Sequence, residues 1–452
     1  MVVPSGDMMS LAKPFRPYTA VSTMDAAALI GRLQNTGWCA LLLPLLNADK
    51  AVRDAAYVAL ENAVSGWERG HRMDLNLSGE DLPLLIEIGM TVKFPASNDW
   101  NRPAHKFMFA FVKINHPWIA RTIAAHFAAA DDAQRLDAIT ILAAQRTEEA
   151  LRTLGALIEQ HGLPARMYAR FFWELNESCE FADLLMPQLV LRAGRYLPGV
   201  VDFTNVALER GKLTLDKLAP ARAFAEQHAA EMLGRVVPYQ RAGKGTRWRS
   251  AEEYAALSHA FGAVLDLLSM IPGASTETLH AATALTDPRL LSIVVAGLLR
   301  QGVEPPLGIV RTAAASHATR AQLYRMLEGR GRLDLFPAEF ITFEAFAASH
   351  IAAWLAYPTE LGYDPELLEL EATLRGTTDE GERQWCLWKF ADADGATFAA
   401  VSGPYDIDPP VGPLSDGDAF SNFAEWDAAT PEQHLESVLE TLRDWRLARQ
   451  LR

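Results

Sequence analysis

An apolar repeat at helical spacing limits the fold more than any other feature of this chain, and it is clearest in residues 286–302, TDPRLLSIVVAGLLRQG. Thr286 or Asp287 can cap a helix, and Pro288 suits a first-turn position whose N–H would be unpaired anyway. Gly302 suits the left-handed position that often ends a helix. The apolar residues between these signals are Leu290, Leu291, Val294, Val295, Leu298 and Leu299. Because this apolar face is too wide for a helix lying on a surface, we expect a helix sandwiched between neighbours, with Leu291 and Val295 buried.

The same spacing returns along much of the chain, separated by short segments rich in Gly and Pro. Segments of 10 to 20 residues with such short connections are typical of antiparallel helix pairs. We therefore predict that residues 24–357 are almost wholly helical, in pairs stacked as a right-handed superhelix or arc. Predicted helices include residues 24–34, 37–46, 47–64, 116–127, 134–144, 147–162, 165–175, 181–192, 219–237, 251–271 and 343–356.

Two of these segments resemble a known repeat. DKAVRDAAYVAL, from Asp49, and DPRLLSIVVAGLL, from Asp287, are similar to the second helix of HEAT or armadillo repeats, in which a polar first residue precedes a Val, Ala and Leu face. The resemblance covers at most residues 24–357. It implies an α-solenoid fold with binding as its usual role, and it brings no catalytic residues with it.

Composition supports a folded chain. Of the 452 residues, 50% are hydrophobic and 22% are charged, which is the profile of a globular protein. The three cysteines, Cys39, Cys179 and Cys386, form no CxxC pair, so a reducing compartment fits better than a disulfide framework. We see no signal peptide and no apolar run of membrane-spanning length, and we expect a cytoplasmic protein without a membrane partner.

The acidity lies at one end. Residues 358–444 hold 20 acidic and 4 basic residues, a balance of −16, whereas the whole chain carries −14. We therefore expect three parts: an extended lead-in over residues 1–22, the helical repeats over 23–357, and an acidic α+β cap over 358–452. In the cap, QWCLWKF and ATFAAVSGPY flank the turn sequence ADADG and predict a β-hairpin across residues 392–395. Residues 406–423 are expected to form a loop and 430–451 a final helix.

Aromatic residues are mixed with carboxylates in this cap, an arrangement suited to a surface for a basic protein. A small β-domain also needs aromatic residues for its own core, and that alternative stays open. If the cap binds a partner, we expect the carboxylates to steer a basic protein toward the two aromatic rings. The candidate partner-binding residues are Asp416, Asp418, Phe423, Glu425, Trp426 and Asp427.

A second candidate site lies in the segment YQRAGKGTRWRS, residues 239–250, which interleaves basic and aromatic side chains. Such a segment can hold phosphate or an acidic partner, although an exposed loop without a ligand is the simpler interpretation. GKGT lacks the earlier glycine of a Walker A loop. The candidate contacts are Arg241, Lys244, Arg247, Trp248 and Arg249.

No motif predicts catalysis or a bound cofactor. The eleven histidines have no HExxH-type spacing, so we expect no metal site. In WELNESCEF, the carboxylates Glu174, Glu177 and Glu180 lie near Cys179, and Glu177 and Glu180, one helical turn apart, are interpreted as a solvated helix end.

Three functions are therefore weighed. The first is a non-enzymatic scaffold that binds a basic protein, for example an immunity or inhibitor protein that holds a toxin. The second is a nucleic-acid-acting enzyme related to HEAT-like DNA glycosylases, which the near-neutral charge of residues 1–357 does not favour. The third is a small-molecule enzyme with its site between the helical and β parts.

Overall fold

The structure is a computed structural model that describes residues 23–68, 80–95, 107–108, 111–112, 114, 116–242, 247–378, 381–407, 412–414 and 417–450. The predicted lead-in over residues 1–22 lies outside these ranges. The described chain is mostly helical, with a small antiparallel sheet near its C-terminal end. It divides into two compact units, Met1–Lys217 and Leu218–Arg452, which are described separately. No helix among the described residues combines the length and apolar character needed to cross a membrane.

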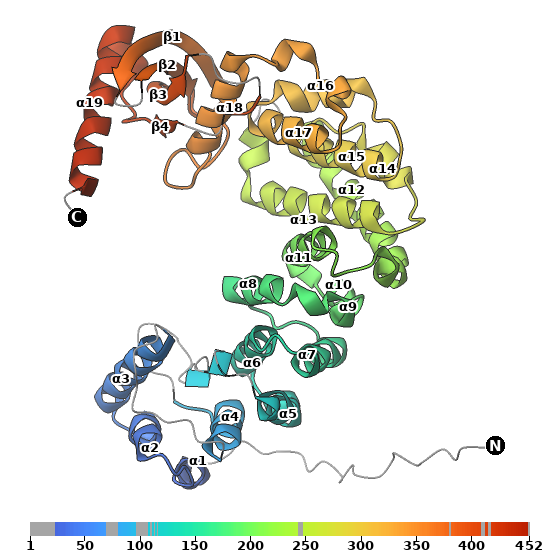
Figure 1. Cartoon of the computed structure of the whole chain (residues 1–452), viewed down its shortest axis with the longest axis vertical. Helices are drawn as coiled ribbons and strands as arrows, with labels where there is room; N and C mark the ends of the chain where they lie inside the picture. Colours follow the sequence, from blue (N-terminus) through green and yellow to red (C-terminus); the bar gives the residue numbers. More distant parts are fainter. Residues whose placement is uncertain are drawn as a thin grey trace. The chain divides into compact units, whose positions relative to one another are not determined.

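The first unit is built from helices, and the connections from α5 onward are short (Figure 1). Asp81 illustrates how the turns are fixed: this buried carboxylate accepts hydrogen bonds from the backbone N–H groups of Gln34 at 2.8 Å and Asn35 at 3.0 Å. The α-helices are α1 Thr23–Ile30, α2 Thr36–Leu42, α3 Lys50–Glu68, α4 Asp81–Thr91, α5 Pro117–His126, α6 Asp132–Ala144, α7 Glu148–His161, α8 Ala169–Glu177, α9 Ala182–Leu185, α10 Gln188–Leu191 and α11 Leu197–Glu209. Short 3-10 turns lie at Leu43–Leu46, Phe127–Ala129, Cys179–Phe181 and Gly194–Tyr196.

Helices of this unit pack mainly on neighbours one or two places along the chain. Contacts join α4 to α5, α5 to α7, α6 to α7 and α8, α7 to α9, and α8 to α11. Small residues allow the close approaches: a Cβ added at Gly155 of α7 would lie 3.0 Å from the carbonyl oxygen of Leu184. Contacts of this local kind are what a stack of helix pairs requires.

One predicted helix of this unit is wrong. Residues 181–192 were expected to form a single helix, but α9 ends at Leu185 and α10 begins at Gln188. Pro187 lies between them, and because proline has no backbone N–H and crowds the preceding turn, it interrupts a helix that the apolar spacing alone would continue.

The second unit consists of helices, then the sheet, then a final helix. Its α-helices are α12 Arg222–Ala242, α13 Glu252–Met270, α14 Glu277–Ala282, α15 Pro288–Arg300, α16 Leu307–Ala315, α17 His317–Gly329 and α18 Phe343–Leu355, followed after the sheet by α19 Pro431–Gln450. Short 3-10 turns lie at Leu215–Ala221, Arg247–Ser250, Leu333–Leu335, Ala338–Phe340 and Trp426–Ala428. As in the first unit, contacts join neighbours such as α12 to α13 and α16 to α17.

Helix α15 is the central helix that its spacing predicts. Asp287 is its N-cap and accepts a hydrogen bond from the backbone N–H of Arg289 at 3.0 Å. Gly302 has a φ of +72°, as expected just after a helix end. The helix contacts α13, α14, α16 and α17. Leu291 and Val295 are fully buried, which confirms the predicted sandwich.

Four strands form the antiparallel sheet in the order β1-β2-β3-β4: β1 Leu367–Thr378, β2 Gly381–Ala391, β3 Thr397–Asp406 and β4 Asp418–Phe420. The predicted hairpin is confirmed, because β2 pairs with β3 and Ala391 lies opposite Thr397. The prediction missed β1 and placed β4 within a loop. Helices give way to strands after α18, close to the boundary proposed at residue 357.

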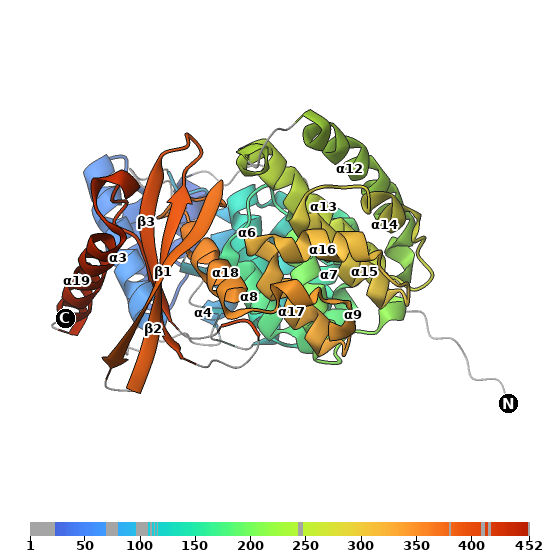
Figure 2. The same ribbon diagram turned by 90° about the horizontal axis from the view of Figure 1, so that it is seen from above.

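The sheet lies between helices α18 and α19, as Figures 1 and 2 show. Alternation along β2 explains this arrangement, since successive side chains of a strand point to opposite faces. Cys386, Trp388 and Phe390 pack with Ile351 of α18. Leu387 packs on the other face with residues of α19, Leu435 and Val438.

A buried arginine joins three helices of this unit. Arg320, on α17, donates from Nε to the carbonyl oxygen of Ala314 at 2.8 Å and from Nη2 to that of Ala315 at 2.9 Å, both at the end of α16. It also donates to the carbonyl oxygen of Ala345 in the first turn of α18. His317 lies beside it, with Nδ1 at 3.4 Å from an Arg320 nitrogen.

The stability of this unit should fall in mild acid because of His317. Burial and the charge of Arg320 lower the pKa of His317 from 6.5 to about 4. Between those values the unfolded chain binds more protons than the folded chain, so the unfolding free energy falls as the pH is lowered. We expect His317→Gln to reduce this slope by at most about 1.4 kcal/mol per pH unit, measured by denaturant unfolding across that range. The exposed His259→Gln is the control, and equal slopes in the two variants would contradict the assignment.

Candidate functional site

A pocket of about 410 Å³ lies in the first unit and is called the α6–α8 pocket below. Its walls come from the C-terminal end of α6, the turn that follows, helix α8, and the two residues Val112 and Ile114. The lining residues are Val112, Ile114, Ala144, Gln145, Arg146, Arg170, Trp173 and Glu174. Its volume is at the small end of the range for ligand sites, which suits a compact ligand.

Arg146 occupies an unusual backbone position at this pocket. Helix α6 ends at Ala144 with Gln145 as its C-cap, and Arg146 follows with a φ of +49°. Glycine or asparagine normally fills this left-handed position, because a Cβ makes it strained. Thr147 then caps α7, so the connection leaves room for a single left-handed residue. An arginine retained in a strained position indicates a use for its side chain.

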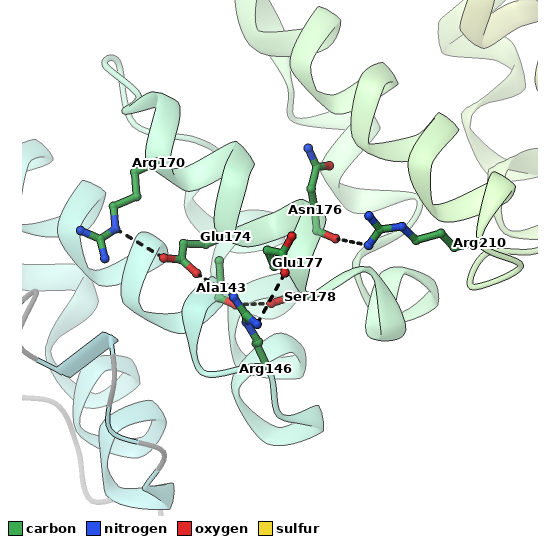
Figure 3. Close-up of polar contacts among 8 residues, drawn as sticks. All are labelled: Ala143, Arg146, Arg170, Glu174, Asn176, Glu177, Ser178 and Arg210. Atoms are coloured by element: carbon green, nitrogen blue, oxygen red, sulfur yellow. Dashed lines mark hydrogen bonds and ion pairs between the residues drawn. The ribbon is translucent and has the colours of Figure 1, made fainter. Parts of the chain in front are cut away.

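A buried carboxylate lies between two arginines (Figure 3). Glu174 is only 2% exposed. Its Oε1 lies 3.4 Å from Arg170 Nε, and its Oε2 lies 3.6 Å from Arg146 Nη2. Arg146 Nη1 also lies 3.6 Å from Oε2 of Glu177, which is largely exposed. Glu174 therefore differs from the exposed Glu177 and Glu180, because the helix turns its side chain toward the arginines.

Gln145 brings a polar atom without a hydrogen-bond partner. The side chain is 4% exposed, and its Nε2 donates to the carbonyl oxygen of Phe111 at 2.9 Å. Its Oε1 is buried and accepts no hydrogen bond from any residue that the structure describes. A buried acceptor in that state is costly, and such exceptions in folded proteins often mark a place for a ligand or water.

Trp173 completes the pocket with an exposed aromatic ring. It is 57% exposed on α8, next to the buried Glu174. Just after α8, the Ser178 hydroxyl donates to the carbonyl oxygen of Ala143, which fixes the end of α8 against α6 (Figure 3). Arg210 of α11 reaches the carbonyl oxygen of Asn176 at 3.4 Å. These contacts hold the C-terminal end of α8, while Trp173 is exposed to solvent.

The structure describes part of the predicted basic segment, residues 239–250. Arg241 is exposed at the end of α12, Lys244 lies outside the described residues, and Arg247 begins a short 3-10 turn. The ring of Trp248 packs edge-on against Tyr254 at 4.7 Å. Arg249 lies over Trp248 at 5.3 Å and donates weakly to the carbonyl oxygen of Thr286 at 3.4 Å.

Arg249 and two nearby residues, Gln240 and Tyr254, contact Thr286 and Asp287 just before α15. Tyr254 donates from its hydroxyl to Oδ2 of Asp287 at 2.7 Å. Burial and the Asp287 carboxylate raise the pKa of Tyr254 far above its usual range, so it stays a donor. Gln240 accepts from the backbone N–H of Thr286 at 2.6 Å. These contacts fix α12 and α13 to the capping residue of α15.

The candidate partner-binding residues of the cap differ in exposure. Asp416 lies outside the described residues, while Asp418 at the start of β4 is exposed, as are Glu425 and Asp427. Two aromatic candidates, Phe423 and Trp426, are half-buried.

Both aromatic rings have partners within the chain. Phe423 has a φ of +54° and packs edge-on against Phe390 and Phe398, each at 5.8 Å. Trp426 stacks on His434 at 5.3 Å, and Lys389 Nζ lies 5.6 Å from its ring centre. The rings therefore contribute to the core of the cap, and the carboxylates remain at its surface.

A second pocket, of about 310 Å³, lies in the second unit beside α15 and α17. Arg289 at its edge is paired with Asp364 at 2.8 Å, and Asp266 is paired with Arg300 at 2.6 Å. Its charged groups are thus satisfied within the chain. Within the described ranges, no three His, Cys, Asp or Glu side chains gather closely enough to hold a metal ion.

A comparison of the chain with protein families, with characterised proteins and with solved structures finds no match.

Proposed function

We propose that this protein is a helical-repeat scaffold of the HEAT or armadillo kind that binds a basic protein partner. The packing of helices on neighbours one or two places along the chain supports a solenoid arrangement in each unit. Solenoids expose long surfaces that commonly serve for binding, so this fold supports a scaffold more directly than a catalyst. An immunity or inhibitor protein that holds a basic toxin is one concrete form of such a scaffold.

The observation that carries the choice of a basic partner is the acidic edge of the sheet. Strand β1 lies at one edge, and no described strand pairs with its outer side. Glu369 and Glu371 on this strand and Glu366 just before it are exposed, and none of the three forms an ion pair with a described basic residue. An unpaired edge offers backbone N–H and C=O groups to an extended segment of a partner. The carboxylates favour a basic segment over an acidic one.

The nucleic-acid alternative gains no support from these contacts. The basic residues that suggested this alternative lie in the segment around Arg241 and Arg249. Arg249 lies over the ring of Trp248 and contacts the carbonyl oxygen of Thr286 within the chain. A nucleic-acid surface needs several cations gathered on one face. We therefore propose the protein-binding function alone.

The acidic edge can be tested with a strand-forming peptide that alternates lysine and valine. We expect it to bind the full chain and its glutamate counterpart not to bind. Glu369→Gln combined with Glu371→Gln should slow association about threefold to tenfold, because exposed charges contribute modestly and act mainly on the association rate. The rate should also depend less steeply on salt, because screening acts on the charges that were removed.

Glu209→Gln combined with Glu328→Gln is the matched control, since both residues are exposed and lie on helices α11 and α17. A third variant, Asp418→Asn with Glu425→Gln and Asp427→Asn, tests the carboxylates near β4 in the same assay. A lysine peptide that does not bind, or equal rates in all variants, would contradict the proposed acidic surface.

A further inference from the structure

We propose that the α6–α8 pocket binds a compact ligand in which a carboxylate lies next to an N–H donor. Two kinds of molecule have this chemistry: a free α-amino acid and the C-terminal residue of a peptide chain. The pocket belongs to the first unit and the acidic edge to the second, so this binding site is additional to the proposed partner surface and does not depend on it.

The N–H donor is required by Gln145. Its Nε2 donates to Phe111 at 2.9 Å, which fixes the orientation of the amide, and its buried Oε1 accepts nothing from the described residues. Because this oxygen is buried in the chain without a ligand, a ligand N–H becomes its partner through a small shift of the Gln145 side chain toward the pocket that it lines. The amide cannot rotate to satisfy itself, because the Phe111 carbonyl would then lose its donor.

The carboxylate is required by Arg146. Both of its ion pairs, to Glu174 and Glu177, are 3.6 Å long. Well-formed bonds between a guanidinium and a carboxylate are about 2.7 to 2.9 Å long, so these contacts leave room for a better acceptor. The planar guanidinium presents several N–H groups in a fork that matches a carboxylate. This use of the side chain explains an arginine at a φ of +49°, where glycine would be relaxed.

The charged side chains around the pocket favour a ligand that has both a carboxylate and an N–H donor. Among the described residues in and beside the pocket, Arg146 and Arg170 are opposed by Glu174 and Glu177, two charges of each sign. A simple anion would be repelled by the two glutamates, and a simple cation by the two arginines. A ligand with a carboxylate and an N–H donor places each group beside its complement.

The volume of the pocket and the aromatic ring at its mouth agree with an amino acid or a peptide C-terminus as the ligand. About 410 Å³ accommodates one amino acid and part of a neighbour, not a large cofactor. Trp173 at the mouth offers a ring face to an apolar or aromatic ligand side chain. Val112 and Ile114 add apolar surface to the wall.

The test uses the full chain and isothermal titration with three probe sets. The sets are the free L-amino acids one by one, their N-acetyl derivatives, and the corresponding amino acid amides. Binding of free amino acids alone identifies a free metabolite, and binding of N-acetyl amino acids identifies a chain terminus, because these keep the carboxylate and an amide N–H. Amides that bind as tightly as the acids, or no binding in any set at millimolar concentration, would overturn the proposal.

Arg146→Gly is the decisive variant, because it removes the guanidinium and relieves the left-handed strain. We expect the variant to fold, because Arg170 still pairs with Glu174, and its affinity to fall about tenfold or more. Trp173→Ala should weaken binding about threefold or more, whereas Trp118→Ala, at another exposed tryptophan of the first unit, should not. An Arg146→Gly protein that folds and binds the probe as tightly as the wild type would rule out the proposed site.

Discussion

Replacing Arg320 by methionine should lower the unfolding free energy of the second unit by about 3 to 5 kcal/mol. The guanidinium is 4% exposed and donates to the backbone carbonyls of Ala314, Ala315 and Ala345. Burial lowers its pKa to about 10, so it remains charged at neutral pH. Methionine fills similar space but leaves these carbonyls without their donor, and a buried unsatisfied acceptor costs far more than an exposed one.

The matched control is Arg325→Met, which makes the same change at an exposed position of the same helix, α17. A surface substitution of this kind should change stability by about 0.5 kcal/mol or less. The measurement is urea unfolding followed by circular dichroism, with both variants compared with the wild type. Equal stabilities would mean that water can replace the guanidinium at the end of α16.

The sequence does not show which arginine of α17 is buried where α16, α17 and α18 meet. The helix spacing of α16, α17 and α18 is visible, but the choice of Arg320 over Arg325 as the buried one depends on where α18 lies. Both arginines belong to one helix, and only the packed structure separates them. Local signals fix helices, whereas the partners of a long polar side chain come from segments far apart in the chain.

The strands of the sheet were also predictable from the sequence only in part. The hairpin between β2 and β3 was predictable because ADADG is a strong turn signal between apolar runs. Strand β1 was missed although Leu368 and Leu370 alternate with Glu369 and Glu371. Leucine and glutamate favour helices in isolation, and here pairing with β2 decides the outcome.

The α6–α8 pocket was visible only in part. Arg170 and Glu174 are four residues apart, which predicts a pair on one helix face, and Trp173 lies between them. Gln145 and Arg146 join them from another helix end, and the positive φ of Arg146 leaves no mark in a sequence that lacks glycine there. The signal to look for was the short connection QRT between two strong helices, which forces its middle residue into an unusual conformation.

The solenoid proposal makes the interior of α15 the most sensitive position in the second unit. Leu291 is 1% exposed and lies on a helix that contacts four others, so Leu291→Ala should cost about 3 to 4 kcal/mol. The substitution removes buried apolar surface and leaves a cavity that close-packed neighbours fill only in part. Because contacts in a stack are shared between neighbours, loss of packing at α15 should also loosen α13 and α16.

Leu307→Ala is the matched control, since Leu307 begins α16 and is 66% exposed. The two variants make the same chemical change, so the difference between their unfolding free energies reports burial alone. Hydrogen exchange of α13 and α16 should accelerate in Leu291→Ala and stay unchanged in Leu307→Ala. If Leu291→Ala unfolds at the same urea concentration as the wild type, α15 is not the central support of the stack. If only α15 exchanges faster, its neighbours are stable without it, and the stacked arrangement proposed for this unit would have to be given up.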